Sequence, residues 1–265
     1  MFITRLASGI VLLIVTVLII KVGGNALGFL ILLLSLIGLF ELYRVIKAEK
    51  SILAIIGYVT TIIYYVLLMC GQKITLSFVI MILILWMVVY ALTFPKYEIN
   101  NIAITFLGVI YIPIMFSFIY QIRMSEFGLY FVGLIFIGAW GCDTFAYCVG
   151  KLFGKHKLAP VLSPKKSIEG AIGGIIGAAV LGLGYGCLIE NQVILAIDVP
   201  LYCLSVCSVV GVVSQIGDLA ASAIKRNYDV KDYGTLIPGH GGIMDRFDSI
   251  LFTAPVIYMF LQWIR

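Results

Sequence analysis

The chain has 265 residues and a formal net charge of +5, and 62% of its residues are hydrophobic whereas only 12% are charged. Soluble domains carry roughly 45–50% apolar and about 25% charged residues, so a water-soluble globule is excluded. Long uncharged apolar runs recur along the whole chain, which indicates an integral membrane protein. No basic stripe with interleaved aromatic residues lies outside these runs, which argues against a nucleic-acid partner.

The apolar runs and the breakers between them predict an all-α, polytopic membrane protein with about nine transmembrane helices. A bilayer core of about 30 Å needs roughly 20 apolar residues per helix. The expected spans are residues 5–22, 25–46, 52–70, 74–94, 101–120, 129–150, 168–189, 199–224 and 248–264. With alternating spans, 14 of the 18 Lys and Arg residues fall on the side that holds the N-terminus. The positive-inside rule therefore places the N-terminus in the cytoplasm and the C-terminus outside.

The acidic residues suggest two functional parts within one continuous membrane domain. Only 4 of the 13 acidic residues precede residue 143. We therefore expect residues 1–125 to be an N-terminal transmembrane scaffold and residues 126–265 to be a C-terminal catalytic region. Glu41, near the end of the second span, is interpreted as part of the scaffold. The two longer polar connections, 151–167 and 225–247, both fall on the predicted cytoplasmic side.

Two predicted spans carry polar side chains on one face. Asp143, Tyr147 and Lys151 are spaced by four residues along the sixth span, where an unpartnered acid costs roughly 2.5–3.5 kcal/mol. The eighth span repeats the pattern with Ser214, Asp218, Ser222 and Lys225, flanked by Gln215. Such a face must contact protein, water or a ligand. An interhelical ion pair or hydrogen-bonded seam and a ligand site both remain open.

The connection after the eighth span combines glycines with acids and bases. It contains Lys225, Arg226, Lys231, Asp232, Gly239, His240, Gly241, Gly242, Asp245, Arg246 and Asp248. Glycines let backbone amides approach an anion, and the cations offer donors for phosphate oxygens. Asp245 and Asp248 are three residues apart at the start of the last span, so both carboxylates can share a hard cation. This combination suits a metal together with a polyphosphate.

The connection before the seventh span contains Lys166, Ser167 and Glu169. Ser167 followed by Glu169 is typical of a helix N-cap, and the positive end of that helix would favour an anion. Lysines at this place also set the membrane topology. A capping role and an anion-binding role therefore both stay open for this segment.

The run from Ser222 to Asp248 resembles the signature of the phosphatidate cytidylyltransferase family, also called CDP-diacylglycerol synthases. It reads Ser-Ala-Ile-Lys-Arg, four residues, Lys-Asp, Tyr-Gly, two residues, Ile-Pro-Gly-His-Gly-Gly-Ile-Met-Asp-Arg-Phe-Asp, without a departure. The Ser-Pro-Lys-Lys-Ser-x-Glu-Gly octet at residues 163–170 and the region of Asp143 are also similar to the family. In the first five spans the resemblance is one of hydropathy and length only.

The resemblance implies an inner-membrane enzyme, commonly a homodimer, that uses CTP, phosphatidic acid and a divalent cation. Its products would be CDP-diacylglycerol and pyrophosphate. The residues themselves indicate a cytoplasm-facing polar pocket at membrane depth, where a soluble nucleotide meets a lipid phosphate. Because both substrates are polyanions, a metal and cationic side chains should neutralise charge and align the lipid phosphate with the nucleotide α-phosphorus. The choice of cytidine and of phosphatidate rests on the resemblance.

The predicted site is concentrated in the C-terminal half of the chain. The predicted catalytic residues are Asp218, Asp245, Asp248, Lys225, Arg226 and Lys166. The predicted substrate-binding residues are Asp143, Ser167, Glu169, Ser222, Lys231, Asp232, Gly239, His240, Gly241, Gly242 and Arg246. His240 can donate to a phosphate or simply hold the loop.

A magnesium ion is expected on Asp218, Asp245 and Asp248, with Asp143 as an additional or supporting ligand and with room for a second cation. The lipid substrate keeps its acyl chains in the bilayer. The pocket is therefore expected to open both to the cytoplasm and sideways to the cytoplasmic leaflet, among spans six to nine.

Three other functions compete with this interpretation. A CTP-dependent kinase or cytidylyltransferase of a polyprenol-type lipid would use the same lysines and carboxylates, although the full match over residues 222–248 argues against it. A cation transporter would explain Asp143 and Asp218 but leaves the glycine loop 239–242 without a role. A purely structural membrane subunit needs no polar stripe at all.

Overall fold

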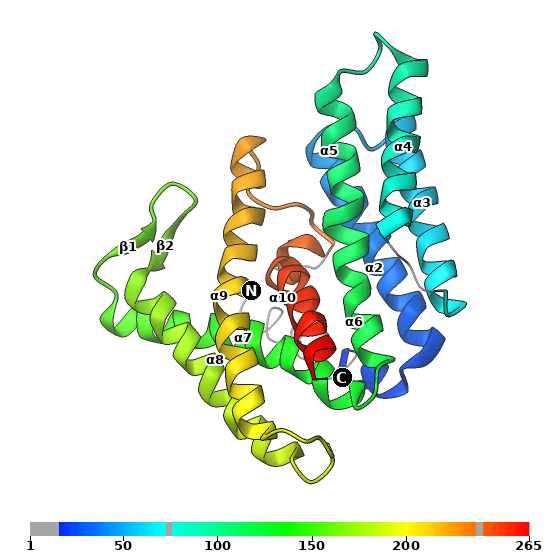
Figure 1. Cartoon of the computed structure of the whole chain (residues 1–265). Coiled ribbons are helices and arrows are strands. Elements are labelled where there is room, and N and C mark those ends of the chain that lie inside the picture. The colour runs from blue at the N-terminus through cyan, green and yellow to red at the C-terminus, as the bar shows by residue number, and fades with distance from the viewer. Residues whose placement is uncertain (1–15, 73–75, 237–240, 265) are drawn as a thin grey trace. The chain divides into compact units, whose positions relative to one another are not determined.

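The computed structural model describes residues 16–72, 76–236 and 241–264. In chain order its elements are α2 (Gly24–Val45), α3 (Ile52–Met69), α4 (Leu76–Thr93), α5 (Ile99–Val109), the π-helix η1 (Ile110–Ile114), α6 (Met115–Arg123), α7 (Gly128–Phe153), β1 (Lys157–Ala159), β2 (Ser163–Ser167), α8 (Ile168–Ile189), α9 (Val199–Asn227) and α10 (Met244–Trp263) (Figure 1). Seven helical segments of the described residues are long and apolar enough to cross a membrane. The prediction of an all-α, polytopic membrane protein is confirmed.

The predicted spans coincide closely with these helices. The prediction 168–189 matches α8 at both ends, and the prediction 199–224 ends slightly before α9 does. Of the first predicted span, 5–22, residues 5–15 lie outside the described residues and residues 16–22 are helical. Helix α10 begins with charged residues and is not among the seven apolar segments. The count of nine crossings and the side of each terminus therefore stay predictions.

The chain divides into two compact units, each built from two stretches of sequence. Unit 1 comprises Met1–Ser117 and Asp232–Asp245, and unit 2 comprises Phe118–Lys231 and Arg246–Arg265. The connection after α9 and the first residues of α10 thus belong to unit 1. The predicted division into an N-terminal scaffold and a C-terminal catalytic region stays a prediction.

In unit 1, buried hydroxyl groups bind backbone at an irregular turn. The π-helix η1 contains Pro113, which lacks an N–H group and interrupts the regular hydrogen-bond ladder. The Tyr65 hydroxyl donates to the Pro113 carbonyl oxygen at 2.9 Å. Ser35 Oγ lies 2.8 Å from this hydroxyl and donates to it, because the Tyr65 hydrogen is already used. Such contacts satisfy the backbone where no water can do so.

In unit 2, glycines on α8 let its backbone pack directly against α7. A Cβ on Gly174 would lie 2.8 Å from the carbonyl oxygen of Cys142, and one on Gly170 would lie 2.7 Å from that of Ala146. Both separations are too short for carbon and oxygen, so the small residues are what permits this approach. Because Asp143 follows Cys142 on α7, the packing also fixes the position of Asp143 along α8.

The other face of α8 carries large apolar side chains at helical spacing. Ile172, Ile176 and Val180 are 54%, 58% and 59% exposed in the single chain. A continuous row of this kind is unusual on a soluble monomer, whereas lipid acyl chains cover it without cost. The row therefore supports the assignment of α8 as a membrane helix.

A short antiparallel hairpin connects α7 and α8. Strand β1 pairs with β2, and the Ile168 N–H donates to the His156 carbonyl oxygen at 2.9 Å. The sequence predicts a polar connection over 151–167 and does not predict strands there. The pairing places Lys165 and Lys166, which β2 carries, next to the start of α8.

Candidate functional site

Helix α9 carries the polar stripe that the sequence predicts. Its N-terminus is capped by Asp198, which accepts the Leu201 N–H at 2.9 Å, and its last turn holds Lys225 and Arg226. Basic side chains at this place complement the partial negative charge of a helix C-terminus. The stripe is thus part of one uninterrupted helix of 29 residues.

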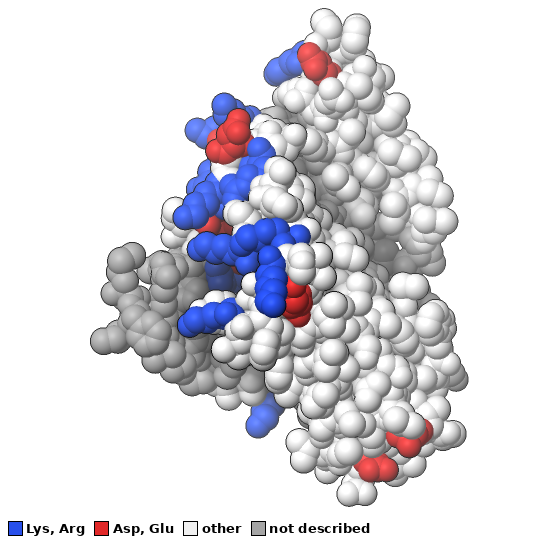
Figure 2. All heavy atoms as spheres, turned by 90° about the vertical axis from the view of Figure 1, so that its left-hand side faces the viewer, with Lys and Arg blue, Asp and Glu red and all other residues white. Residues whose placement is uncertain are grey.

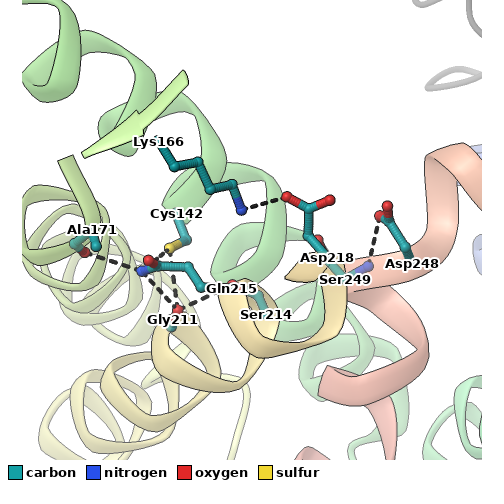
Figure 3. Close-up of polar contacts among 9 residues, drawn as sticks. All are labelled: Cys142, Lys166, Ala171, Gly211, Ser214, Gln215, Asp218, Asp248 and Ser249. Atoms are coloured by element: carbon teal, nitrogen blue, oxygen red, sulfur yellow. Dashed lines mark hydrogen bonds and ion pairs between the residues drawn. The ribbon is translucent and has the colours of Figure 1, made fainter. Parts of the chain in front are cut away.

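The first residues of the stripe join α9 to its neighbours in unit 2. Gln215 Nε2 donates to the carbonyl oxygen of Ala171 on α8 at 3.0 Å and to that of Gly211 at 3.2 Å (Figure 3). Cys142 Sγ of α7 donates to the same Gly211 carbonyl oxygen at 3.3 Å, and Ser214 Oγ donates to it within α9 at 3.1 Å. This end of the stripe is a hydrogen-bonded helix seam, which is one of the two interpretations that the sequence leaves open.

Asp218, one turn beyond Ser214 on α9, forms an ion pair with Lys166 of β2 (Figure 3). The two side chains are only 27% and 25% exposed. A charged group with little access to water is stable only when it is paired, so each of these residues stabilises the other. The fold therefore brings the lysine motif of the hairpin onto the polar stripe of α9.

Two more carboxylates accompany Asp218 in unit 2, namely Asp143 of α7 and Asp248 of α10. Asp143 and Asp248 each interact electrostatically with Asp218 and with one another. The cations that act on this acidic cluster of Asp143, Asp218 and Asp248 are Lys166, Lys225 and Arg246. Because carboxylates repel one another, positive charge nearby stabilises the cluster.

The acidic cluster offers only oxygen ligands, which suit a hard divalent cation. Within the described residues, no group of three His, Cys, Asp or Glu side chains converges closely enough to hold one. Lys166 provides the positive charge at Asp218 in this structure. The type of donor therefore fits a divalent cation, and the Asp218 oxygen that does not face Lys166 is one such donor.

A cavity of about 420 Å³ is bordered by Lys166, within the usual size range of small-molecule sites. Its wall comes from α7, the hairpin, the start of α8 and α9. Its polar lining residues are Asp143, Tyr147, Lys151, Ser163, Lys165, Lys166, Ser167 and Gln215. Three lysines around one cavity suit an anionic ligand such as a polyphosphate.

The cavity belongs to a strongly basic face of unit 2. Figure 2 shows Lys and Arg side chains gathered on one part of the visible surface, while most of the rest is uncharged. Lys151, Lys155, Lys157 and Lys165 are all exposed, and the first and last of them line the cavity. A concentration of one sign of charge attracts ligands of the opposite sign.

Ser167 and Glu169 hold the junction between hairpin and helix. Ser167 Oγ accepts the Gly170 N–H at 3.1 Å, which confirms the predicted N-cap of α8. Glu169 Oε1 lies 2.6 Å from His156 Nδ1, and Glu169 Oε2 accepts the Lys155 N–H at 3.1 Å. These contacts fix the base of the hairpin. The predicted contacts of Ser167 and Glu169 with substrate stay predictions.

In unit 1, Asp245 organises the loop in front of α10. Its Oδ2 atom accepts the N–H of Tyr233 at 2.8 Å and the N–H of Gly242 at 3.0 Å. Gly241 has φ of +83°, which favours glycine. The Gly242 N–H is therefore engaged within the protein in this structure, while the predicted metal-binding role of Asp245 stays a prediction.

The other predicted site residues lie further along α9 and in the following connection. Ser222 is half-buried on α9, one turn beyond Asp218, and Arg226 is exposed with Nη1 donating to the Val230 carbonyl oxygen at 3.3 Å. Lys231 and Asp232 are exposed. Gly239 and His240 lie outside the described residues. The roles assigned to these residues stay predictions.

Two residues of evident structural importance are absent from the predicted site. Gln215 flanks the polar stripe, and its buried amide donates a hydrogen bond from α9 to α8. Glu41 is only 3% exposed and accepts hydrogen bonds from the N–H groups of Ile243 and Met244. The signal for Glu41 was an ionisable residue within an apolar helix, which is rare and marks a specific partner.

Comparison with known proteins relates the whole chain to one family. The family model described as "Cytidylyltransferase family" matches residues 3–264. A phosphatidate cytidylyltransferase of Bacillus subtilis (strain 168) is 34% identical over 270 residues, covering 97% of this chain and 96% of the relative. Phosphatidate cytidylyltransferases of Staphylococcus aureus (strain COL) and Staphylococcus haemolyticus (strain JCSC1435) are 35% and 33% identical, each over 97% of this chain and 98% of the relative. The chain belongs to the cytidylyltransferase family and is a nucleotidyltransferase of the membrane.

Proposed function

We propose that this chain transfers the cytidylyl group of CTP to phosphatidic acid, giving CDP-diacylglycerol and pyrophosphate. The observation that carries the proposal is the Lys166–Asp218 ion pair beside a lysine-lined cavity in a membrane protein. The names of the relatives, which are similar over nearly the whole chain, supply the substrates. The lipid phosphate attacks the α-phosphorus of CTP and pyrophosphate leaves, so no covalent enzyme intermediate is needed.

Cationic side chains have the largest task in this reaction, because two polyanions must approach each other. Lys166, Lys225, Arg226 and Arg246 bind phosphate oxygens and stabilise the charge that spreads over them in the transition state. Lys166 and Arg246 interact electrostatically with Asp143, and Lys225 interacts electrostatically with Asp248. Contacts of His240 and of the glycines before α10 with phosphate are proposed on the family resemblance.

We assign the divalent cation of this family to Mg²⁺, held by Asp218, Asp245 and Asp248, with Asp143 as a further or supporting ligand. The support is the oxygen-only donor set and the electrostatic interaction among Asp143, Asp218 and Asp248 in unit 2. Asp245 is included because it lies three residues before Asp248 in the sequence. When bound, Mg²⁺ neutralises phosphate charge and orients the nucleotide. A second cation fits the number of carboxylates.

We place the site on the cytoplasmic side of the cell membrane, where CTP is available, and in a homodimer. The distribution of Lys and Arg supports the side, and the family resemblance supports the dimer. We further propose that the cavity opens sideways to the cytoplasmic leaflet among α7, α8, α9 and α10. Moving acyl chains into water would cost about 0.8 kcal/mol for each CH₂ group, and a lateral opening avoids this.

The function is tested with the purified full chain in lipid nanodiscs. CTP, phosphatidic acid and Mg²⁺ should yield equal amounts of pyrophosphate and CDP-diacylglycerol, the second identified by mass spectrometry. Parallel reactions replace phosphatidic acid by a polyprenol or a polyprenyl phosphate, and CTP by ATP, GTP or UTP. Product from the polyprenol substrates alone, or no product from CTP and phosphatidic acid, would contradict the proposal.

A further inference from the structure

Glu41 is a buried carboxylate in the otherwise apolar helix α2 of unit 1. It is 3% exposed, and both of its oxygens are used by backbone of the same unit. Oε1 accepts the Ile243 N–H at 3.0 Å, and Oε2 accepts the Met244 N–H at 2.9 Å. These N–H groups stand at the start of α10, where a helix presents unsatisfied donors and partial positive charge. A side chain from α2 thus caps α10.

Two glycines in the connection between α9 and α10 lie against the same carboxylate. A Cβ on Gly234 would lie 2.9 Å from the carboxyl carbon of Glu41, and a Cβ on Gly242 would lie 2.5 Å from it. Both distances are shorter than real Cβ contacts, so a larger residue at either place would have to displace the Glu41 carboxylate from its hydrogen bonds. Two glycines of the sequence signature therefore serve this contact.

Arg44 lies on the same helix as Glu41, three residues further on, and binds the other end of the connection. Its Nη2 atom donates to the Tyr233 carbonyl oxygen at 2.9 Å. The Tyr233 N–H in turn donates to Asp245 Oδ2 at 2.8 Å. Helix α2 therefore binds both described ends of the connection: Arg44 binds the segment 232–236, and Glu41 binds the segment 241–245. Asp245 links the two segments through its own hydrogen bonds.

We propose that Glu41 and Arg44 are positioning residues of the enzyme: they fix the start of α10 and the orientation of Asp245, and neither touches a substrate. The inference rests on the proposed function, because it assumes that Asp245 acts on the catalytic cation. It gives the N-terminal half of the chain a role in positioning a proposed catalytic residue. The contacts of Glu41 with Ile243 and Met244 do not depend on that assumption.

The test compares Glu41→Gln, Glu41→Asp and Arg44→Lys with the wild-type full chain in nanodiscs. Glu41→Gln keeps the shape but turns an NH₂ group toward one of the two N–H donors and removes the charge at the helix start. Glu98→Gln is the matched control, since Glu98 is an exposed carboxylate at the N-cap of α5 in the same unit. Three quantities are measured: kcat, the Mg²⁺ concentration at half-maximal rate, and amide hydrogen exchange at Ile243 and Met244.

We expect Glu41→Gln to lower kcat, or to raise the half-saturating Mg²⁺ concentration, by about 10- to 100-fold, as for other residues that orient metal ligands. Exchange at Ile243 and Met244 should accelerate, Arg44→Lys should show a smaller effect of the same kind, and Glu98→Gln should stay within twofold of wild type. A purely structural role would lower the melting temperature without changing the Mg²⁺ dependence or kcat of the folded fraction, and that result would overturn the proposal. Should Glu41→Gln fail to fold, Arg44→Lys and Glu41→Asp decide the matter by the same measurements. An inactive wild type would refute the proposed function, whereas the exchange rates would still report on the contact.

Discussion

Lys166 and Asp218 form an ion pair that joins the β-hairpin to α9 within unit 2. Each partner is also the natural binding group for one component of the proposed reaction. A triphosphate can compete with Asp218 for the ammonium group of Lys166, and a divalent cation can compete with Lys166 for the carboxylate. In the proposed reaction, binding of the nucleotide and its cation would replace this ion pair by two new contacts, so that each side chain would keep a partner of opposite charge.

Replacement of Asp218 by Asn should abolish most of the turnover. Asn keeps the size of the side chain and one oxygen acceptor but loses the charge, so we expect kcat to fall by at least about 100-fold while the helices persist. Pyrophosphate release is measured over a wide range of Mg²⁺ concentrations, and circular dichroism reports the helix content. Near-normal turnover of this variant at any Mg²⁺ concentration would remove Asp218 from the site.

Replacement of Lys166 by Ala should impair both nucleotide binding and rate. It leaves Asp218 without its ion-pair partner and the cavity without one phosphate donor, so kcat/KM for CTP should fall by roughly 100-fold. Lys166→Arg should restore part of the loss. Lys157→Ala, which removes an exposed lysine of β1, is the control and should leave the kinetics unchanged. Equal behaviour of Lys157→Ala and Lys166→Ala would show that only the general basic charge matters.

Lys225→Ala tests the cationic end of α9. Lys225 acts electrostatically on Asp248, and we expect its loss to lower kcat/KM by at least about tenfold, or about 1.4 kcal/mol. The effect should appear with both substrates, because the proposed function brings both phosphates to this side chain. The measurement is steady-state kinetics with the concentrations of CTP and phosphatidic acid varied in turn. Unchanged kcat/KM values for both substrates would show that Lys225 is not part of the site.

A pair of glycine variants tests the packing of α8 against α7. Gly174→Ala would place a Cβ 2.8 Å from the Cys142 carbonyl oxygen, and it should destabilise the protein by about 1–3 kcal/mol. Gly184→Ala on the same helix meets nothing within 4 Å and should be neutral or slightly stabilising. Unfolding in nanodiscs or mild detergent, followed by tryptophan fluorescence, compares the two. Equal stability of both variants would contradict the packing described here.

The membrane architecture follows from the sequence because its causes are local. An apolar run of sufficient length must become a helix in a bilayer, and Ser167 and Asp198 mark where α8 and α9 begin. The π-helix at Pro113 was not predicted, since the turn depends on hydroxyl groups supplied by other helices. The hairpin 157–167 was not predicted either, because its strands lack an alternating apolar pattern and pair only in the folded chain.

The candidate site follows from the sequence in part. The polar stripe and the lysine motif were visible as unusual residue types in apolar surroundings, but their meeting at Lys166 and Asp218 is a consequence of tertiary packing. Glu41 was assigned to the scaffold because its partners are backbone N–H groups about two hundred residues away. Every residue except proline has the same backbone N–H group, so the sequence does not indicate which of them a side chain binds. Such a contact is seen only in the structure.

The length of α9 has a consequence for where the reaction takes place. At 1.5 Å per residue its 29 residues extend over about 44 Å, whereas the hydrocarbon layer is about 30 Å thick. If Val199 starts at one boundary of that layer, Asp218 comes about 28 Å later, close to the opposite boundary. Lys225 and Arg226 then project among the lipid headgroups. With α9 placed in this way, the phosphate of a membrane lipid lies near the level of Asp218 before any binding occurs, so the bilayer itself brings the proposed lipid substrate to the depth of the acidic cluster.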